Sequence, residues 1–286
     1  MPGPVSHGRF VWYDLMTHDP DAAAEFYAKV AGWGSMAWDG PEPPDGHGPY
    51  MMFTAGEHPI GGRAKLPAEA LEKGAAPHWL AYVTVPDTEA VVSRTEEMGG
   101  AVLMATETME GVGTMAVLQD PQGAVFAPFT PEEGAGGEIP VPESGKFSWH
   151  ELLTTDHEAA FEFYAGVFGW EKTDAMDMGE MGTYQMFGPE KGNPLSYGGM
   201  YNKPPQIPAP PHWLYYIMVP DIEAAAVAVK ELGGQVLNGP EVVPGGDRVA
   251  QCLDPQGAAF ALHSKDAGGG QQGGRYDEKR GGSDLG

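Results

Sequence analysis

The chain is built from an internal repeat, and this repeat limits the possible folds more than any other feature. Residues 8–15 (GRFVWYDL) return as residues 145–152 (GKFSWHEL), 137 positions later. Residues 77–82 (PHWLAY) return as 211–216 (PHWLYY), and 120–124 (DPQGA) return as 254–258, both 134 positions later. Solenoid repeats have periods of about 20–50 residues, so a period this long indicates two duplicated domains. Two similar domains that pack together enclose a cleft, and clefts are where proteins bind small molecules.

Each half contains two further similar segments, each with a strand followed by a helix. An Asp precedes and a Gly follows every predicted helix, always 13 positions apart: Asp19 and Gly32, Asp87 and Gly100, Asp156 and Gly169, Asp221 and Gly234. The Asp carboxylate can accept the free N–H groups of the first helical turn. The Gly is expected to supply the left-handed residue that ends the helix. Apolar strand patterns follow each helix, so the sequence predicts four β-α-β-β-β modules.

The predicted helices have one apolar face, as in residues 26–31 and their copy 163–168, which suits packing on one side of a sheet. We therefore predict an α+β fold with two tandem domains, each of paired βαβββ modules that form a cleft between curved mixed sheets. The predicted domains are residues 8–130 and 147–265, joined by a Pro- and Gly-rich linker at 131–146. The Gly-rich tail at 266–286 is predicted to be disordered.

The chain is strongly acidic, with 40 Asp and Glu against 16 Lys and Arg and a formal net charge of −24. Such a surface repels phosphate backbones and anionic lipids, so we expect neither nucleic acid nor a membrane as partner. The first residues show no basic and apolar signal segment, and no run of about 18 apolar residues occurs. A cytoplasmic protein is expected.

Cys252 is the single cysteine, which excludes an intrachain disulfide and a cysteine-based zinc cluster. It lies in a strand-like apolar run, where a small buried side chain is the expected role.

The helices carry Phe-Tyr and then Gly-Trp, as Phe26-Tyr27 with Gly32-Trp33 and again at 163–164 with 169–170, and Asp-Pro-Gln-Gly precedes each last strand. With these motifs the chain resembles the vicinal oxygen chelate superfamily, which includes glyoxalase I, bleomycin-resistance proteins and extradiol dioxygenases. The resemblance covers nearly all of residues 8–264. The segments 10–15 and 147–152 resemble the tandem branch described as hydroxylase-like or 27-kDa-antigen-like.

The resemblance also implies where a metal would bind. Catalytic members carry a His or Gln on the first strand and a Glu on the last strand of a module pair. The matching positions hold side chains that cannot bind a divalent cation: Trp12, Leu80 and Ala127 in the first domain, and Trp149, Leu214 and Ala261 in the second. The remaining positions fall near the pairs Gly61-Gly62 and Gly198-Gly199. We therefore predict no metal ligands at the usual positions and no cofactor.

Strand alternation puts other polar side chains on the same inward face. Two residues along from the matched positions lie Asp14, Tyr82 and Phe129 in the first domain, and Glu151, Tyr216 and His263 in the second. We predict Glu151, His263 and Tyr216 as the catalytic candidates, because an inward carboxylate is costly without a partner or a task. The predicted substrate-binding residues are Trp12, Asp14, His78, Tyr82, Trp149 and His212. The two Trp rings would either stack on a planar ligand or plug the cavity, whereas His150 should alternate away and pack under the helix or at a domain contact.

The sequence leaves two main functions open. The first is a glyoxalase- or dioxygenase-like protein that binds a small molecule in a cleft lined by aromatic and Met residues, without the usual metal ligands. The second is a lyase or oxygenase acting on a small carbonyl or aromatic substrate, with Glu151 and His263 as acid and base or as displaced metal ligands. An interaction protein using the acidic surface is a third possibility without a specific motif. In each of the first two the partner is a small molecule, and the chain is a monomer or homodimer.

Overall fold

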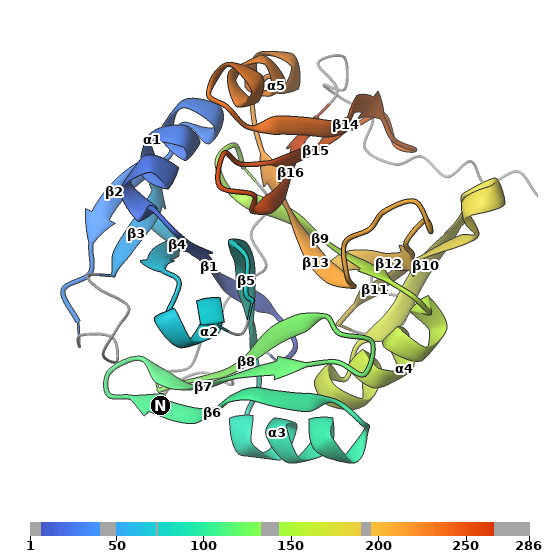
Figure 1. Cartoon of the computed structure of the whole chain (residues 1–286). Coiled ribbons are helices and arrows are strands. Elements are labelled where there is room, and N and C mark those ends of the chain that lie inside the picture. The colour runs from blue at the N-terminus through green and yellow to red at the C-terminus, as the bar shows by residue number, and fades with distance from the viewer. Residues whose placement is uncertain (1–6, 41–49, 73, 133–142, 190–195, 266–286) are drawn as a thin grey trace, which may run out of the picture.

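The computed structural model describes residues 7–40, 50–72, 74–132, 143–189 and 196–265. The predicted disordered tail at 266–286 and most of the predicted linker at 131–146 lie outside these residues. The α+β class with two tandem domains is confirmed, because the chain forms two mixed eight-stranded sheets with helices (Figure 1). No helix in the described part of the chain is long and apolar enough to span a membrane.

The first domain runs through two βαβββ modules with one short extra helix. Its elements are β1 (Phe10–Thr17), α1 (Pro20–Ala31), β2 (Gly34–Ala37), β3 (Met51–Ala55), β4 (His58–Lys65), α2 (Ala68–Glu72), β5 (His78–Thr84), α3 (Thr88–Glu97), β6 (Ala101–Met109), β7 (Gly113–Gln119) and β8 (Val125–Pro131).

The second domain repeats this order, with a single 3₁₀ turn in its first module. Its elements are β9 (Phe147–Thr154), α4 (His157–Phe168), β10 (Glu171–Asp177), η1 (Gly179–Met181), β11 (Thr183–Gly188), β12 (Gly198–Asn202), β13 (His212–Met218), α5 (Ile222–Glu231), β14 (Gln235–Val242), β15 (Arg248–Leu253) and β16 (Ala259–Ser264).

The two modules of each domain join edge to edge into one sheet. The first sheet has the order β2-β3-β4-β1-β5-β8-β7-β6, and the second has the matching order β10-β11-β12-β9-β13-β16-β15-β14. At the centre, β1 pairs antiparallel with β5, and β9 with β13. Each of these strands has a parallel partner on its other side. The first strands of the modules therefore lie side by side in the middle of each sheet.

The predicted Asp caps are confirmed at all four long helices, where Asp19, Asp87, Asp156 and Asp221 accept N–H groups of the first turn. Helices α1 and α4 end at left-handed Gly32 and Gly169, as predicted.

The prediction for the ends of α3 and α5 is wrong by one residue. Their left-handed glycines are Gly99 and Gly233, with φ of 86° and 87°. Gly100 and Gly234 serve a different purpose, because a Cβ atom there would lie 2.6 and 2.7 Å from the carbonyl oxygens of Gln119 and Leu253. They let the backbone pass close to the neighbouring strand.

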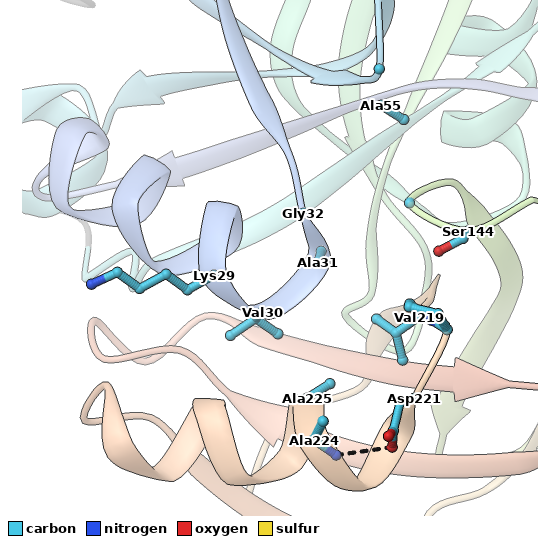
Figure 2. A pocket seen from close by; sticks show the side chains of 13 residues that line it. Lys29, Val30, Ala31, Gly32, Ala55, Ser144, Val219, Asp221, Ala224 and Ala225 are labelled. Carbon is cyan, nitrogen blue, oxygen red and sulfur yellow. Dashed lines mark hydrogen bonds between the residues drawn. The ribbon is translucent and has the colours of Figure 1, made fainter.

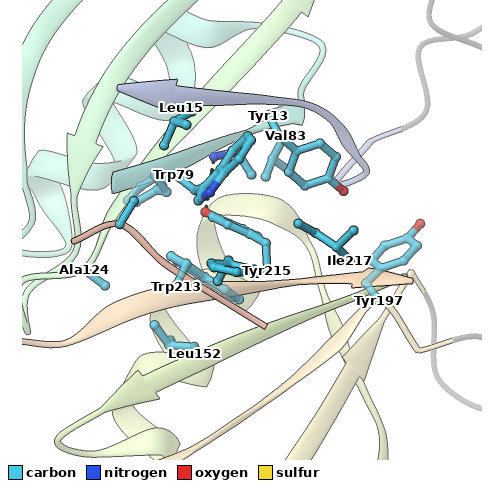
Figure 3. Close-up of a cluster of buried hydrophobic side chains, with 14 of the residues drawn as sticks. Tyr13, Leu15, Trp79, Val83, Ala124, Leu152, Tyr197, Trp213, Tyr215 and Ile217 are labelled. Carbon is cyan, nitrogen blue, oxygen red and sulfur yellow. Dashed lines mark hydrogen bonds between the residues drawn. The ribbon is translucent and has the colours of Figure 1, made fainter. Parts of the chain in front are cut away.

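One apolar core lies between the two sheets and takes side chains from both domains. Figure 3 shows Tyr13, Leu15 and Trp79 of the first domain facing Trp213 and Tyr215 of the second (Figure 3). The helices pair across the same junction, α1 beside α5 and α3 beside α4. The opposite face of each sheet turns away from this shared core, and we call it the outer face.

The Asp-Pro-Gln-Gly turns of one domain bind the other domain. Asp120 and Asp254 each accept backbone N–H groups of their own turn. They also accept the hydroxyls of Tyr164 and Tyr27 across the junction, at 3.1 and 3.3 Å. The Asp-Pro-Gln-Gly motif is therefore an element of domain docking as well as a turn.

Gln122 and Gln256, from the same turns, reach the helix starts of the other domain. The side-chain oxygen of Gln122 accepts the backbone N–H of Asp156 at 2.6 Å, and that of Gln256 accepts the N–H of Asp19 at 2.7 Å. These paired contacts follow the sequence repeat and fix the two domains against each other.

His150 lies at this domain contact, as its place on the strand predicts. Its Nδ1–H donates to the carbonyl oxygen of Tyr197 at 2.5 Å, and its Nε2 accepts the hydroxyl of Tyr13 at 2.6 Å. Phe10 stacks on the ring with centroids 3.7 Å apart. Burial lowers the pKa of His150 to about 4, so the ring is neutral at neutral pH.

Candidate functional site

The polar residues that the alternation pattern groups on one face of each strand lie on the outer faces of β1 and β9, and not on an inward face as the sequence predicted. Trp12 lies opposite Tyr82 on β5, and Trp149 lies opposite Tyr216 on β13. Two residues further along each strand come the carboxylates of Asp14 and Glu151, both buried. The sheet therefore brings one carboxylate, one Trp and one Tyr together on each outer face.

In the second domain, hydrogen bonds reach both oxygens of Glu151. The hydroxyls of Tyr216 and Tyr184 donate to its Oε1 and Oε2, each at 3.0 Å, and Nε2 of Gln251 donates to Oε1 at 3.3 Å. The Nε1–H of Trp149 donates to the hydroxyl of Tyr184 at 2.7 Å. We call these five residues the Glu151 centre.

The Glu151 carboxyl holds its proton more tightly than an exposed one does. Burial raises its pKa to about 7, and the hydrogen bonds from Tyr216, Tyr184 and Gln251 offset part of that rise. Burial also raises the pKa of Tyr184 and Tyr216 well above the ordinary value. The carboxyl is therefore the group of this centre that changes charge near neutral pH.

The first domain has a matching arrangement, the Asp14 centre. The hydroxyl of Tyr50 donates to Oδ1 of Asp14 at 2.5 Å, and Nε1–H of Trp12 lies 3.0 Å from the same oxygen and 2.7 Å from the Tyr50 hydroxyl. Tyr82 hydrogen-bonds to the same carboxyl, whose pKa burial raises. Trp12 contacts its carboxylate directly, whereas Trp149 reaches Glu151 through Tyr184.

The Gly pairs singled out in the sequence make room for these tyrosines. Gly62 lies opposite Asp14, and Gly199 lies opposite Glu151. A Cβ atom on Gly62 would clash with the ring and hydroxyl of Tyr50, and one on Gly199 would clash with the ring of Tyr184. The missing side chains let each Tyr cross the neighbouring strand and reach the carboxylate.

The predicted histidines have other partners. His263 is hydrogen-bonded to the Ser148 hydroxyl through Nδ1 at 2.8 Å and to Asp247 through Nε2 at 3.0 Å. At the strand starts, Nδ1–H of His78 and of His212 donates to the carbonyl oxygens of Ala76 and Pro210, each at 2.8 Å. The structure thus joins Glu151, Tyr216 and Trp149 in one network but gives these histidines separate hydrogen bonds.

The donors at the two centres do not fit a divalent cation. Each centre has one carboxylate, and its neighbours direct O–H and N–H groups at that carboxylate. A Trp N–H can only donate and cannot ligate a metal. Within the described ranges, no three His, Cys, Asp or Glu side chains gather closely enough to hold a metal ion. We therefore derive no metal-dependent step.

Apolar side chains surround the Glu151 centre on the same outer face. Buried Leu153, Tyr201, Leu214 and Ala261 pack with Tyr184 and Tyr216. The half-buried residues packed against them are Trp149, Met176, Met178, Met186, Ile207, Val249 and Ala259. The carboxyl thus lies in an aromatic and Met-rich setting.

A cavity of about 440 Å³ lies elsewhere, at the domain junction. It is bounded by the end of α1 and the start of α5, where Figure 2 shows Ala31, Ser144 and Asp221 around it (Figure 2). The residue that the repeat relates to Ala31 is Phe168, which is buried against Tyr164 and Trp170. Ala31 lines the cavity, and no residue of either centre lines it.

Sequence reasoning missed Tyr50, Tyr184 and Gln251. The two tyrosines are themselves separated by 134 positions, the same offset as His78 and His212. That offset is the signal that could have found them. Gln251 has no such copy, because Val117 occupies the matching position.

Comparison with known proteins agrees with this fold. Residues 146–262 match the Glyoxalase/Bleomycin resistance protein/Dioxygenase superfamily, and residues 11–128 match the glyoxalase-like domain. The chain belongs to this superfamily, the vicinal oxygen chelate proteins that its motifs predict.

Two relatives match nearly the whole chain. A Mycobacterium tuberculosis protein with the provisional name glyoxylase CFP32 is 34% identical over 251 residues, which cover 88% of this chain and 92% of that protein. The anthracycline biosynthesis protein DnrV of Streptomyces peucetius is 30% identical over 272 residues, covering 89% and 92%.

Solved structures share the fold at low sequence identity. The Mn(II)-bound glyoxalase from Novosphingobium aromaticivorans matches with a TM-score of 0.57 and 18% identity, covering 92% of this chain and 83% of that one. The 2,3-dioxygenase LapB from Pseudomonas sp. KL28 matches with a TM-score of 0.60 and 12% identity, covering 92% and 94%.

Proposed function

We propose that the chain binds a small, planar, largely apolar molecule at the Glu151 centre, without a protein-bound divalent metal. The observation that carries this proposal is a buried carboxyl, hydrogen-bonded at both oxygens, within an apolar outer face. Trp149 is half-buried there and offers a flat ring for stacking. Met176, Met178 and Met186 supply flexible apolar surface that adapts to a ligand.

Two observations favour the second domain and an aromatic ligand. In the Asp14 centre, the Trp12 N–H lies within hydrogen-bond distance of both Asp14 and Tyr50, which ties its ring to the carboxyl, whereas Trp149 donates to Tyr184 and packs against the apolar cluster around Glu151. The relative DnrV is named for anthracycline biosynthesis, and anthracyclines are planar aromatic compounds. We propose a ligand of this general class that bears at least one carbonyl.

Calorimetric titration with 2-acetylnaphthalene, a small planar aromatic ketone, tests the proposal. Trp149→Ala is expected to weaken binding by about tenfold or more, the usual effect of removing an aromatic anchor. Trp12→Ala is the matched variant in the first domain and is expected to change binding by less than about twofold. Equal losses in both variants, or no binding by the intact chain, would contradict the proposal.

The metal-free part of the proposal has its own test. Elemental analysis of the protein as purified is expected to find no stoichiometric Mn, Fe, Ni or Zn. One tightly bound metal ion per domain would overturn this part.

A second candidate function is proton transfer next to a carbonyl, as in a glyoxalase-type lyase. The raised pKa of Glu151 favours it, because a general base works best when its pKa lies near the working pH. The ionised carboxylate would take a proton from the carbon beside the carbonyl and return one from solvent. Exchange of the acetyl protons of 2-acetylnaphthalene for deuterium measures this step. If Glu151→Gln and His263→Ala exchange these protons as fast as the intact chain, this function fails.

A further inference from the structure

We propose that Tyr184 is the group that hydrogen-bonds a ligand carbonyl, and that the protonation of Glu151 decides whether it can do so. The protonated carboxyl turns the Tyr184 hydroxyl toward the ligand, and the ionised carboxylate turns it back into the protein. This inference rests on the proposed binding at the Glu151 centre and names the ligand group recognised there: a neutral hydrogen-bond acceptor.

One hydrogen bond of the Tyr184 hydroxyl has a fixed direction. Nε1–H of Trp149 can only donate, so the Tyr184 oxygen accepts this hydrogen bond in every state. A tyrosine hydroxyl has one proton to donate and can accept at most two hydrogen bonds. The contact between the Tyr184 hydroxyl and Oε2 of Glu151, at 3.0 Å, can therefore run in either direction.

When Glu151 is ionised, its carboxylate can only accept. Tyr184 must then donate its one proton to Oε2, and no O–H remains for a ligand. When Glu151 carries a proton on Oε2, that oxygen donates to Tyr184 instead. The Tyr184 oxygen then accepts from both Trp149 and Glu151, and its own proton is left to point at a third partner.

The other carboxyl oxygen keeps its role in both states. Oε1 accepts from Tyr216 and also from the N–H of Gln251, which can only donate, whereas the partner of Oε2 is a hydroxyl that can reverse. The fixed donor at Oε1 favours Oε2, beside Tyr184, as the site of the exchangeable proton. The raised pKa of Glu151, about 7, puts both states within reach of ordinary buffers.

The titratable groups around the carboxyl come from several strands. Tyr184 on β11, Tyr201 on β12 and Tyr216 on β13 face it, and burial raises the pKa of all three tyrosines, so they stay neutral near pH 7. On β16, His263 pairs with Asp247 and Ser148 and so has hydrogen bonds of its own. Glu241 on β14 acts on Tyr201. Glu151 is thus the group whose titration reverses the Tyr184 bond.

The apolar surroundings make this bond selective. A buried O–H without a partner is costly, so a ligand that satisfies it gains affinity over one that does not. The isosteres 2-acetylnaphthalene and 2-isopropenylnaphthalene differ in whether they present a carbonyl oxygen or a methylene group. The difference in their affinities reports the Tyr184 hydrogen bond apart from stacking.

The experiment measures equilibrium binding of both probes near pH 5.5 and near pH 8.5. The intact chain is expected to bind the ketone about fivefold more tightly at the lower pH, the usual size of one net hydrogen bond, and to bind the hydrocarbon no more tightly at the lower pH than at the higher. Tyr184→Phe is expected to bind the ketone equally at both pH values, with the weaker affinity that the intact chain shows at the higher pH. Glu151→Gln also removes the pH effect but keeps the tighter affinity, because its amide N–H₂ donates to Tyr184 at every pH. Tyr50→Phe, the matched variant in the first domain, keeps the profile of the intact chain.

The outcomes separate this inference from the proposed function. If neither probe binds at either pH, the proposed function fails. If both probes bind and the ketone shows no pH effect, or Tyr184→Phe keeps that effect, binding stands and the inference is wrong. Should Tyr184→Phe fail to fold, infrared spectra of the intact chain decide. Ketone binding must shift the protonated-carboxyl band that Glu151→Gln lacks, and an unshifted band overturns the inference.

Discussion

The Glu151 side chain is buried among neutral hydrogen-bonding groups, and its stability cost depends on its charge. Tyr184, Tyr216 and Gln251 contact it, and none of them is basic. A buried carboxylate with neutral partners keeps part of its desolvation penalty, which is why the pKa rises. The ionised Glu151 side chain therefore lowers the stability of the fold, although Glu151 is also the residue of the candidate function.

Glu151→Gln is expected to gain stability over the intact chain as pH rises from about 4.5 to about 7. The ordinary pKa of Glu is 4.5 and the folded value is about 7. Within this window the unfolded chain has lost the proton that the folded chain still binds, so stability falls by about 1.4 kcal/mol per pH unit. The Gln side chain at position 151 does not titrate, so this variant does not lose stability for this reason. Urea unfolding at several pH values measures the difference.

The control is Glu171→Gln at the exposed start of β10. Its free energy of unfolding should follow that of the intact chain across the window. Parallel curves for Glu151→Gln and the intact chain would show that the Glu151 carboxyl does not titrate as described.

At this scale the sequence could predict part of the candidate site. Strand alternation placed Trp149, Glu151 and Tyr216 together, because side chains two apart on a strand share a face. Tyr184 comes from another part of the module, and only the folded register brings it across Gly199 to the carboxyl. The partners of His263 were not predictable either, since Ser148 and Asp247 lie far from it in sequence.

Strands β4 and β12 shape the two centres because each carries a glycine, without a side chain, opposite the carboxylate. Gly62 and Gly199 leave open the space through which Tyr50 and Tyr184 reach their carboxylates. The Gly pairs can be found in the sequence, but the room that they leave for the two tyrosines follows only from the strand order.

Gly199→Ala is expected to destabilise the fold by about 1–3 kcal/mol, because the added methyl overpacks against the Tyr184 ring. It should also weaken binding of 2-acetylnaphthalene, since Tyr184 must move. Gly62→Ala is the matched variant, with a similar expected stability loss but unchanged binding. Thermal unfolding and titration of both variants check this. A Gly199→Ala variant that binds normally would refute the role assigned to this glycine.

Helices and turns were the most predictable elements. The Asp caps follow from local chemistry alone, so the starts of α1, α3, α4 and α5 agree with the sequence pattern. The ends of α3 and α5 differ by one residue, because close backbone packing rather than helix termination requires Gly100 and Gly234. Sequence rules for helix ends do not predict this close approach to a neighbouring strand.

The whole molecule depends on docking of its two halves. The repeat in the sequence predicts two similar domains, but their mutual orientation rests on contacts between distant residues such as Tyr27 with Asp254 and Tyr164 with Asp120. The Asp-Pro-Gln-Gly motif is visible in the sequence, and its role across the junction appears only in the assembled fold. A shared apolar core joins the two halves.

Acidification is expected to weaken this docking through His150. Its ordinary pKa is 6.5 and burial lowers the folded value to about 4. Between these pH values the unfolded chain binds a proton that the folded chain does not bind. The free energy of unfolding therefore falls by about 1.4 kcal/mol for each unit that the pH drops. His150→Gln is expected to show a shallower pH dependence from pH 6.5 to 4 in urea unfolding. His18→Gln, at an exposed position just before α1, serves as the control, and equal slopes in all three proteins would exclude His150 as the cause.

Ligand binding at the Glu151 centre of the second domain can be observed in a crystal structure of the chain with 2-acetylnaphthalene, grown near pH 5.5. We expect the naphthalene ring to lie against Trp149 and the carbonyl oxygen to lie within hydrogen-bond distance of the Tyr184 hydroxyl. Ligand at the Asp14 centre or in the cavity beside Ala31, or a metal ion on Glu151, would contradict this expectation.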